Sequence, residues 1–423
     1  MNREWIVLKF GGTSVSSLSS LQTIHNICEK KIQKGHKVLV VCSAKSGISN
    51  KLEALISLST KNKYEDLLLE IKKEHQEFCQ ALEIAPAETL LQSEFDELTK
   101  ITLGISLLGS CKAQVVARLM SLGELMLTKI AGEWLGARMD IHWVDVRHIL
   151  KTKTGHTSHH CESRSYLSAS SLLESGEHIS NFLEEKRSNC FITQGFIANN
   201  QKNETVLLGR GGSDITATYL GAALQATSVE IWTDVPGMFT ANPRSLASAR
   251  LLKHLHYEEA RELASSGAKV LHPKCIDFLS RKKIPLVIAW TQRPKQQGTI
   301  IDHHTQENGA QVKAVATKSS VYVISLESAG MWQEVGFLAD VFSCFKKHDI
   351  SIDLIATSQS TITVTLDSFT TSLDESTLDF LMEDLSRICH AKKIGPCAVV
   401  NLVGRRIRAI LPVIGPMLEA FRE

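Results

Sequence analysis

Short apolar runs alternate with segments of helical periodicity over the first ~300 residues, a pattern typical of an α/β sheet. The apolar runs predict strands at residues 5–10, 37–42, 137–144, 190–197, 205–208, 229–233 and 284–290. Helical periodicity predicts helices at 20–34, 213–225 and 258–266, the second beginning at Ser213 or Asp214. We expect a helical insertion over residues 50–135, where no strand pattern occurs, and a polar loop over 151–165.

The pattern changes after the Pro- and Gly-containing segment 293–298. It then predicts strands at 320–326, 350–354, 361–366 and 397–402, and helices at 334–348 and 374–389. These elements follow the order βαββαβ, which is that of a ferredoxin-like unit. A helix-like stretch at 407–421 begins a further copy. We therefore predict an α/β domain at 1–295, a ferredoxin-like unit at 310–395 and a partial second unit at 396–423.

Composition narrows the class of protein. Of the 423 residues, 43% are hydrophobic and 22% charged, and the net charge is +2, which gives no electrostatic basis for binding nucleic acid or an anionic membrane. Ten cysteines without a C-x-x-C spacing favour a reducing cytoplasm. No apolar run is long enough for a signal peptide or a membrane span. The His- and Cys-rich segment 156–161 lacks the spacing of metal ligands, so we predict no resident metal site.

The first strand runs into Lys9-Phe-Gly-Gly-Thr-Ser14, just before a predicted helix. Consecutive glycines let backbone N–H groups approach an anion, and a helix N-terminus adds partial positive charge. Lys9 adds a full charge, so the motif predicts a phosphate site. It matches none of the common phosphate-binding patterns, and an ordinary strand-to-helix turn is the alternative.

A second glycine-rich turn, Leu208-Gly-Arg-Gly-Gly-Ser-Asp214, also follows a predicted strand. An arginine side chain suits a carboxylate or a phosphate, and Asp214 offers an acceptor for an ammonium group. The alternatives are a surface charge for Arg210 and a helix N-cap for Asp214. Two anion-binding turns in one domain favour a reaction between two anions.

Three further features are candidates for the same site. The segment 232–244 contains a Pro-Gly turn after a strand end, where ligands bind in such sheets, although it also fits an ordinary hairpin. Lys269 adds a second cation, unless it is a solvated lysine. Glu124 lies in an apolar helical stretch, where a carboxylate needs a partner or a ligand unless it faces solvent.

Together these motifs resemble those of the aspartate kinases in the amino-acid kinase superfamily. The matching segments are 9–15, 43–50, 123–124, 209–214, 232–237 and 267–273. The C-terminal βαββαβ pattern is similar to the ACT regulatory domains of that family, and the monofunctional, lysine-sensitive branch is the most similar. The resemblance implies a sandwich-type kinase domain with a mostly parallel central sheet, followed by ACT units.

The resemblance implies that Mg²⁺–ATP phosphorylates the side-chain carboxylate of L-aspartate to 4-phospho-L-aspartate, the first step towards lysine and diaminopimelate, threonine and methionine. The implied catalytic residues are Lys9, Asp214 and Lys269. The implied aspartate site comprises Ser49, Glu124, Arg210, Gly211, Gly212 and Ser213, with Glu124 on the ammonium group and Arg210 on a carboxylate. The implied ATP site comprises Lys9, Gly11, Gly12, Thr13, Ser14, Thr233, Asp234, Phe239, Arg244, Lys269 and Val270.

Four positions depart from the family pattern. Ser49 replaces the usual threonine and keeps the hydroxyl, whereas Phe239 replaces a tyrosine and loses a hydrogen bond to the nucleotide. Asn242 and Leu122 replace an aspartate and a histidine. None of these changes removes a charge assigned to the chemistry, so we expect any effect to be on nucleotide affinity.

The resemblance also implies regulation. The positions matching the effector pocket of the lysine-sensitive branch are Met331, Gly336, Phe337, Leu338, Asp353, Thr357 and Ser358. Asp353 can pair with the ammonium group of a basic amino acid, so we expect inhibition by lysine. The partial second ACT unit lacks about 25 residues of the family pattern, enough for two strands and a helix. An incomplete sheet exposes an edge, so we expect a homodimer through the ACT units.

Two other functions stay open. A related kinase would act on glutamate, acetylglutamate or a nucleotide, but the segment 232–237 and the ACT pattern argue against it. An amino-acid sensor that has lost catalysis is the other alternative, and the intact Lys9, Arg210, Asp214 and Lys269 argue against it.

Overall fold

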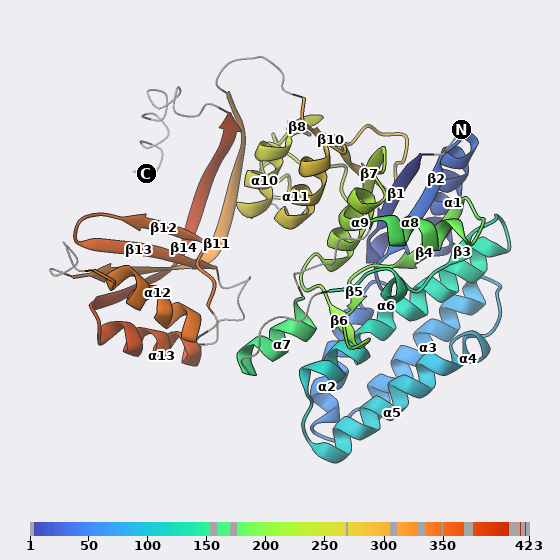
Figure 1. Ribbon diagram of the computed structural model, residues 1–423, viewed down its shortest axis with the longest axis horizontal. Coiled ribbons are helices and arrows are strands. Elements are labelled where there is room, and N and C mark those ends of the chain that lie inside the picture. The colour runs from blue at the N-terminus through green and yellow to red at the C-terminus, as the bar shows by residue number, and fades with distance from the viewer. Residues whose placement is uncertain are drawn as a thin grey trace. The chain divides into compact units, whose positions relative to one another are not determined.

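The computed structural model describes residues 4–152, 159–169, 176–267, 270–304, 311–328, 335–348, 350–367 and 375–405, together with Gly415 and Glu419. The chain divides into two compact units, Met1–Gly309 and Ala310–Glu423, which we call the first and the second unit (Figure 1).

An eight-stranded sheet forms the centre of the first unit, in the order β3-β4-β2-β1-β7-β9-β10-β8. Its strands are β1 Trp5–Phe10, β2 Lys37–Cys42, β3 His142–Trp143, β4 Cys190–Gln194, β7 Ser228–Thr233, β8 His254–His256, β9 Leu286–Trp290 and β10 Thr299–Asp302. A separate pair comprises β5 Ile197–Asn199 and β6 Thr205–Leu207. β1 runs parallel to both β2 and β7, whereas β10 is antiparallel to β9 and parallel to β8, so β8 and β10 run opposite to the other described strands of the sheet. β1 and β4 are buried along their whole length, as expected for a parallel sheet covered on both faces, so the predicted α/β class is confirmed.

The helices of the first unit are α1 Leu18–Gln33, α2 Ile48–Ser59, α3 Glu65–Ala81, α4 Ala87–Leu90, α5 Gln92–Leu108, α6 Ala113–Gly136, α7 His159–Leu167, α8 Gly176–Glu184, α9 Gly212–Ala223, α10 Tyr257–Ser265 and α11 Pro273–Lys282. Two short 3₁₀ helices are η1 Gly12–Ser14 and η2 Val146–His148. Helices α2 to α6 follow one another along the chain and lie together, in blue to cyan in Figure 1, which confirms the predicted helical insertion.

Several predicted elements of the first unit are wrong in extent. The strand predicted at 137–144 is reduced to β3, because α6 continues to Gly136. The loop predicted at 151–165 contains the start of α7. Helix α9 begins after Gly211, whose φ of 71° is left-handed, and not at Ser213 or Asp214. The hydrophobic pattern does not predict β8, β10 or α11; strands of three or four residues are too short to show a period.

The second unit contains β11 Gln311–Glu327, α12 Phe337–Lys347, β12 Leu354–Thr357, β13 Thr361–Asp367, α13 Glu375–Ser386 and β14 His390–Arg405. This is the predicted βαββαβ order, and the four strands form an antiparallel sheet in the order β12-β13-β11-β14. The strand predicted at 350–354 lies later, in β12. The predicted boundary between residues 395 and 396 falls inside β14, which pairs with both halves of β11. The helix predicted at 407–421 lies almost wholly outside the described residues.

The core of the second unit lies between one face of this sheet and the two helices. Among its buried residues are Ile324 and Val364 from the strands and Val341 and Leu381 from the helices. The helices do not cover the edge strand β12, and all four of its residues are exposed. Leu354 and Ile355 keep 54% and 53% of their surface accessible, so the described part of this unit has an apolar edge.

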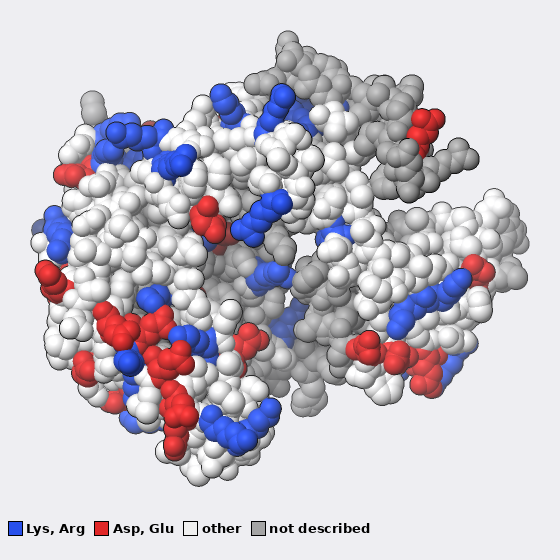
Figure 2. Space-filling view, turned by 180° about the vertical axis from the view of Figure 1, so that it is seen from behind, with Lys and Arg blue, Asp and Glu red and all other residues white. Residues whose placement is uncertain are grey.

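Charge on the described surface is mixed. Figure 2 shows acidic side chains gathered over part of one face with lysines and arginines beside them, and the described part of that face has no extended basic area. Among the described helices, none combines the length and the apolar character that a bilayer crossing requires.

Candidate functional site

The carboxyl ends of three adjacent strands meet in the first unit. Phe10 of β1 lies opposite Cys42 of β2 and Trp232 of β7 in the sheet register. The Gly11 N–H donates to the Trp232 carbonyl at 3.3 Å. Gly12 approaches the next loop so closely that a Cβ there would lie 2.9 Å from the Ala44 carbonyl oxygen. The glycine pair thus lets the predicted phosphate turn fit between two neighbouring loops.

Lys9 joins this turn to the second glycine-rich turn. Its Nζ lies 2.6 Å from Oδ1 of Asp214, in the first turn of α9, and the two side chains are only 11% and 14% exposed. The same Nζ would be 3.6 Å from a Cβ at Gly11. The two predicted anion-binding turns, far apart in sequence, therefore meet at one ion pair.

The second turn owes its shape to glycines. Gly209 and Gly211 both have a φ of 71°, which disfavours other residues. A Cβ at Gly211 would lie 2.6 Å from the Cβ of His272, so the N-terminus of α11 closes this side of the turn. Arg210 is exposed between them. Burial, followed by the charge of Lys274, lowers the pKa of His272, which favours a neutral ring.

Glu124 lies in α6, at the side of the loop that follows β2. Its side chain is buried, and Oε1 accepts a hydrogen bond from the Ala44 N–H at 3.2 Å. Its Oε2 has no hydrogen-bond partner among the described residues. Burial is the main reason that its pKa rises from 4.5 to about 8. A buried carboxyl with an unused oxygen has the character of a ligand-binding group.

Close packing of α6 on α2 sets the position of Glu124. A Cβ at Gly123 would lie 3.1 Å from the Ala44 Cβ and 3.2 Å from Leu52 Cδ1, so glycine is the residue that fits. Ser49 lies in the first turn of α2, which begins after Gly47 with a φ of 86°. Glu124 and Ala44 are therefore in contact, and Ser49 belongs to the helix that packs against α6.

The remaining candidates extend from β7 and from the first turn. Thr233 ends β7, and its hydroxyl donates to Asp234 Oδ1 at 3.1 Å. Phe239 and Arg244 follow in a longer loop, where Phe239 forms a bridge with Leu251 and Arg244 is exposed. Thr13 is also exposed, and Val270 is half-buried.

The structure places Ser14 in a contact but does not describe Lys269. The Ser14 hydroxyl lies 2.7 Å from the Thr291 hydroxyl, which ties the first turn to the residue after β9. Lys269 lies outside the described residues. Within the described residues no group of three metal-ligating side chains occurs.

The effector candidates of the second unit fall into two sets. Gly336 is the N-cap of α12, Phe337 is buried in the core, and Leu338 is 47% exposed. Met331 lies outside the described residues.

The other set flanks β12. Asp353 precedes the strand, and its Oδ2 lies 2.9 Å from Nζ of Lys318. Thr357 ends the strand, and the Ser358 hydroxyl lies 2.6 Å from that of Thr361. Asp353 therefore already has a lysine partner inside the chain.

Some residues of the site escape the sequence analysis. His272 contacts the second turn, and Ala44 contacts Glu124, yet neither was given a role there. His272 falls in the segment 267–273, which signalled the region but not the contact. Nothing local indicated that Ala44 and Glu124, 80 positions apart, would meet.

Comparison with known proteins identifies the family of this chain. Residues 4–289 match the family model described as the amino acid kinase family, and residues 324–368 match an ACT domain. The chain is 33% identical over 414 residues to the lysine-sensitive aspartokinase 3 of Escherichia coli (strain K12), a match that spans 95% of this chain and 87% of that protein. The chain belongs to the aspartokinases of the amino acid kinase family. The kinase match of this aspartokinase contains Lys9, Glu124 and Asp214.

Solved aspartokinase structures share the fold. Escherichia coli aspartokinase III in complex with aspartate and ADP, in its R-state, gives a TM-score of 0.81 at 29% identity, over 98% of this chain and 92% of that one. The same enzyme in complex with lysine and aspartate, in its T-state, gives 0.72 at 30% identity, over 97% and 91%. The ACT match of the aspartokinase chain described here contains Asp353, Thr357 and Ser358.

Proposed function

We propose that this aspartokinase transfers the terminal phosphoryl group of ATP to the side-chain carboxylate of L-aspartate. The product is 4-phospho-L-aspartate, the first intermediate towards lysine and diaminopimelate, threonine and methionine. The observation that carries the proposal is the Lys9–Asp214 ion pair, which joins two glycine-rich turns at the carboxyl ends of β1, β2 and β7. Ligands of open α/β sheets bind at such strand ends.

The chemistry needs alignment and charge neutralisation more than proton transfer. The acceptor carboxylate is an anion at neutral pH, so no general base is needed. Two negative reactants repel each other, and a fixed cation lowers that repulsion most where water is excluded. We assign this role to Lys9, with Gly11, Gly12, Thr13 and Ser14 around the phosphates. Lys269 is the second cation in the proposal.

The aspartate site is proposed at the junction of α2, α6 and α9. Glu124 would accept the α-ammonium group on its unused oxygen, and Arg210 would hold a carboxylate from the second turn. Ser49 and the residues Gly211 to Ser213 line the space between them in this assignment. The nucleotide would lie towards β7, next to Thr233, Asp234, Phe239, Arg244 and Val270.

The reaction implies a Mg²⁺ ion that arrives with ATP. Magnesium in such sites keeps several waters and takes only one or two protein carboxylates beside the phosphates. The described residues fit that requirement, because Asp234 follows the end of β7 and Asp214 lies beside Lys9 near the end of β1. The ion would neutralise phosphate charge.

Regulation is proposed for the second unit. The ACT region would bind lysine near Gly336, Leu338, Asp353, Thr357 and Ser358, with the effector ammonium on Asp353. Since Asp353 already contacts Lys318, the effector has to replace one ammonium group by another. In domain terms, we propose residues 1–295 as the kinase domain, an ACT domain that runs from 310 to the end of β14 at Arg405, and part of a second ACT unit after it.

We also propose a homodimer formed through the second units. The support is the edge strand β12, where Leu354 and Ile355 are more than half exposed. Light scattering should give twice the chain mass, and Leu354→Asp should shift it towards one chain. The control is Leu69→Asp, because Leu69 of α3 is 65% exposed in the first unit. A monomer at all concentrations would refute the dimer.

The decisive test of the kinase function is trapping the acyl phosphate with hydroxylamine, using Mg²⁺–ATP and L-aspartate. Hydroxamate from aspartate and not from glutamate is the expected result. Signal from glutamate instead would indicate a related kinase. Folded protein that binds ATP and yields no hydroxamate with either acid would overturn the proposal in favour of a sensor.

A further inference from the structure

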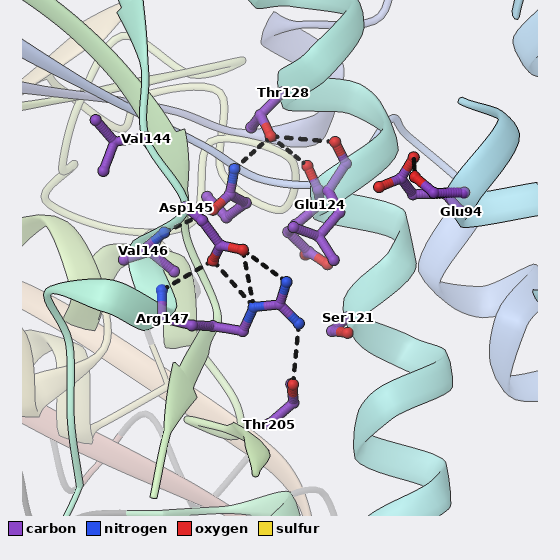
Figure 3. Close-up of polar contacts among 12 residues, drawn as sticks. Glu94, Ser121, Glu124, Thr128, Val144, Asp145, Val146, Arg147 and Thr205 are labelled. Carbon is purple, nitrogen blue, oxygen red and sulfur yellow. Dashed lines mark hydrogen bonds and ion pairs between the residues drawn. The ribbon is translucent and has the colours of Figure 1, made fainter. Parts of the chain in front are cut away.

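Behind Glu124, the hydroxyl of Thr128 joins helix α6 to two strands. Its Oγ1 donates to the Glu124 carbonyl at 2.8 Å, one turn back along α6. The same oxygen accepts from Gln194 Nε2 of β4 at 2.7 Å and from Trp143 Nε1 of β3 at 3.1 Å. Figure 3 shows the Thr128 hydroxyl bonded to the backbone of α6 beside Glu124. Thr128 and Gln194 are fully buried, so water does not compete with these bonds.

The bonding of this hydroxyl is saturated. A hydroxyl has one proton and two lone pairs, and here two N–H donors occupy the lone pairs. The proton therefore has to point to the helix, to the Glu124 carbonyl at 2.8 Å and at longer range the Leu125 carbonyl at 3.3 Å. The orientation of the Gln194 amide is fixed as well, since its Oε1 accepts from the Val146 N–H at 2.8 Å. Each donor of the network therefore faces an acceptor.

Gln194 also leads to the other half of the site. It ends β4 opposite Cys42 of β2, and the N–H of the next residue, Gly195, donates to the Cys42 carbonyl at 2.8 Å. Gly195 lies against the start of α9, because a Cβ there would be 2.5 Å from the Cβ of Ser213. One dipeptide thus touches the helix that carries Glu124 and the helix that carries Asp214.

We infer that Thr128 and Gln194 are positioning residues for the amino-acid subsite. They fix where Glu124 of α6 lies relative to the loop after β2 and to the start of α9. The inference rests on the proposed role of Glu124 in holding the substrate ammonium group. The nucleotide side has no part in the network, which is made by α6, β3, β4 and η2. The effect of these residues therefore falls on aspartate and not on ATP.

Thr128→Val tests this inference, because it keeps the shape and removes the hydroxyl. The donors of Gln194 and Trp143 lose their acceptor while buried, so the strands and α6 have to move apart or admit water. We expect the KM for aspartate to rise about tenfold, since small displacements of binding groups are costly, while the KM for ATP stays within about twofold. Thr128→Ser restores the hydroxyl and should recover most of the aspartate affinity.

Thr193→Val is the matched control. Thr193 is the neighbour of Gln194, is equally buried, and its hydroxyl donates to the Val144 carbonyl at 2.8 Å. It loses a buried hydrogen bond between strands but has no bond to α6 in the network. We expect a lower melting temperature with both KM values unchanged, which separates loss of stability from loss of positioning.

The outcomes also separate this inference from the proposed function. If wild-type protein forms hydroxamate but Thr128→Val changes both KM values equally, or neither, the positioning role is wrong. The same conclusion follows if Thr193→Val raises the KM for aspartate as much as Thr128→Val does. If wild-type protein forms no hydroxamate, the kinase function itself fails.

Discussion

The two units of this chain each place a lysine on an aspartate beside a proposed amino-acid site, but in different surroundings. Lys9 belongs to a strand with parallel neighbours on both sides, and the Lys9 and Asp214 side chains are 11% and 14% exposed. Lys318 and Asp353 belong to a sheet covered on one face, with side chains 17% and 30% exposed. The first pair lies between the central sheet and the start of α9, whereas the second lies next to an exposed edge strand.

The difference indicates what each pair can do. A buried pair held between the central sheet and the start of a helix keeps its charges aimed at one point, which suits a reaction that needs fixed cations. A partly exposed pair contributes little to stability and exchanges partners readily. The first arrangement therefore suits catalysis and the second suits a reversible switch by a charged effector.

Replacing Lys9 should break the catalytic pair with the largest effect. Lys9→Ala removes the cation that faces both glycine turns, so we expect turnover to fall by about 10³-fold or more in the hydroxamate assay. Lys37→Ala is the control, because Lys37 begins the adjacent strand β2 and pairs with Glu184 at 3.3 Å, at the opposite end of the strand from the candidate site. Unchanged turnover in Lys9→Ala would instead favour the sensor.

Removing the charge of Glu124 should have the second-largest effect. Glu124→Gln leaves the substrate ammonium without its carboxylate, so the KM for aspartate should rise about 10- to 100-fold. Glu94→Gln is the control: this buried carboxyl of α5 pairs with Lys129, and its loss should leave the KM for aspartate unchanged. Equal KM values in wild type and Glu124→Gln would remove Glu124 from the aspartate site.

Glu124→Gln should also change how the Tm depends on pH. The folded pKa of Glu124, about 8, lies above the ordinary value of 4.5, so the folded protein holds this proton more tightly than the unfolded chain. Wild type therefore loses stability as the pH rises through this window. The Tm advantage of Glu124→Gln should grow from pH 5 to pH 8 and then level off. An advantage independent of pH would show that burial does not raise this pKa.

A change at Lys318 tests whether the Lys318–Asp353 pair exchanges its lysine for an effector. Lys318→Met leaves Asp353 without its internal partner, so lysine should bind more easily and half-inhibition should occur at about fivefold lower lysine concentration. Turnover without lysine should stay the same. Lys392→Met, at an exposed lysine of β14, is the control. Weaker inhibition in Lys318→Met would show that Lys318 supports effector binding.

The smallest expected effect concerns the nucleotide. Phe239→Tyr restores the hydroxyl that the family usually carries there, and one half-buried hydrogen bond should lower the KM for ATP about twofold. Phe380→Tyr, on the 61% exposed Phe380 of α13, should change nothing. No change in Phe239→Tyr would place this ring outside the nucleotide site.

Local pattern predicts the central strands and the two turns because their signals are continuous in sequence. β1 and β2 have the predicted bounds, since a buried strand is a short apolar run bordered by polar residues. β8 and β10 have three and four residues and leave no such signal. The start of α9 at Gly211 depends on backbone conformation, which side-chain preferences at Ser213 do not reveal.

The sequence predicted which residues belong to the candidate site but not which of them are in contact. The motifs pointed to Lys9 and Asp214, but their 2.6 Å approach depends on the order of strands in the sheet. The hydrogen bond between Thr128 and Gln194 spans 66 positions, and neither residue lies in one of the motifs used. Long-range partners of this kind follow from packing, which no local period encodes.

At the proposed aspartate site, the carboxyl of Glu124 would couple substrate binding to proton release. With a pKa of about 8, this carboxyl carries its proton in most molecules at pH 7. An ammonium group needs the ionised form, so aspartate bound at this proposed site would release close to one proton into the buffer. Its apparent affinity then increases nearly tenfold for each pH unit up to about 8. The heat of binding measured by calorimetry will therefore differ between phosphate and Tris by the ionisation enthalpies of those buffers.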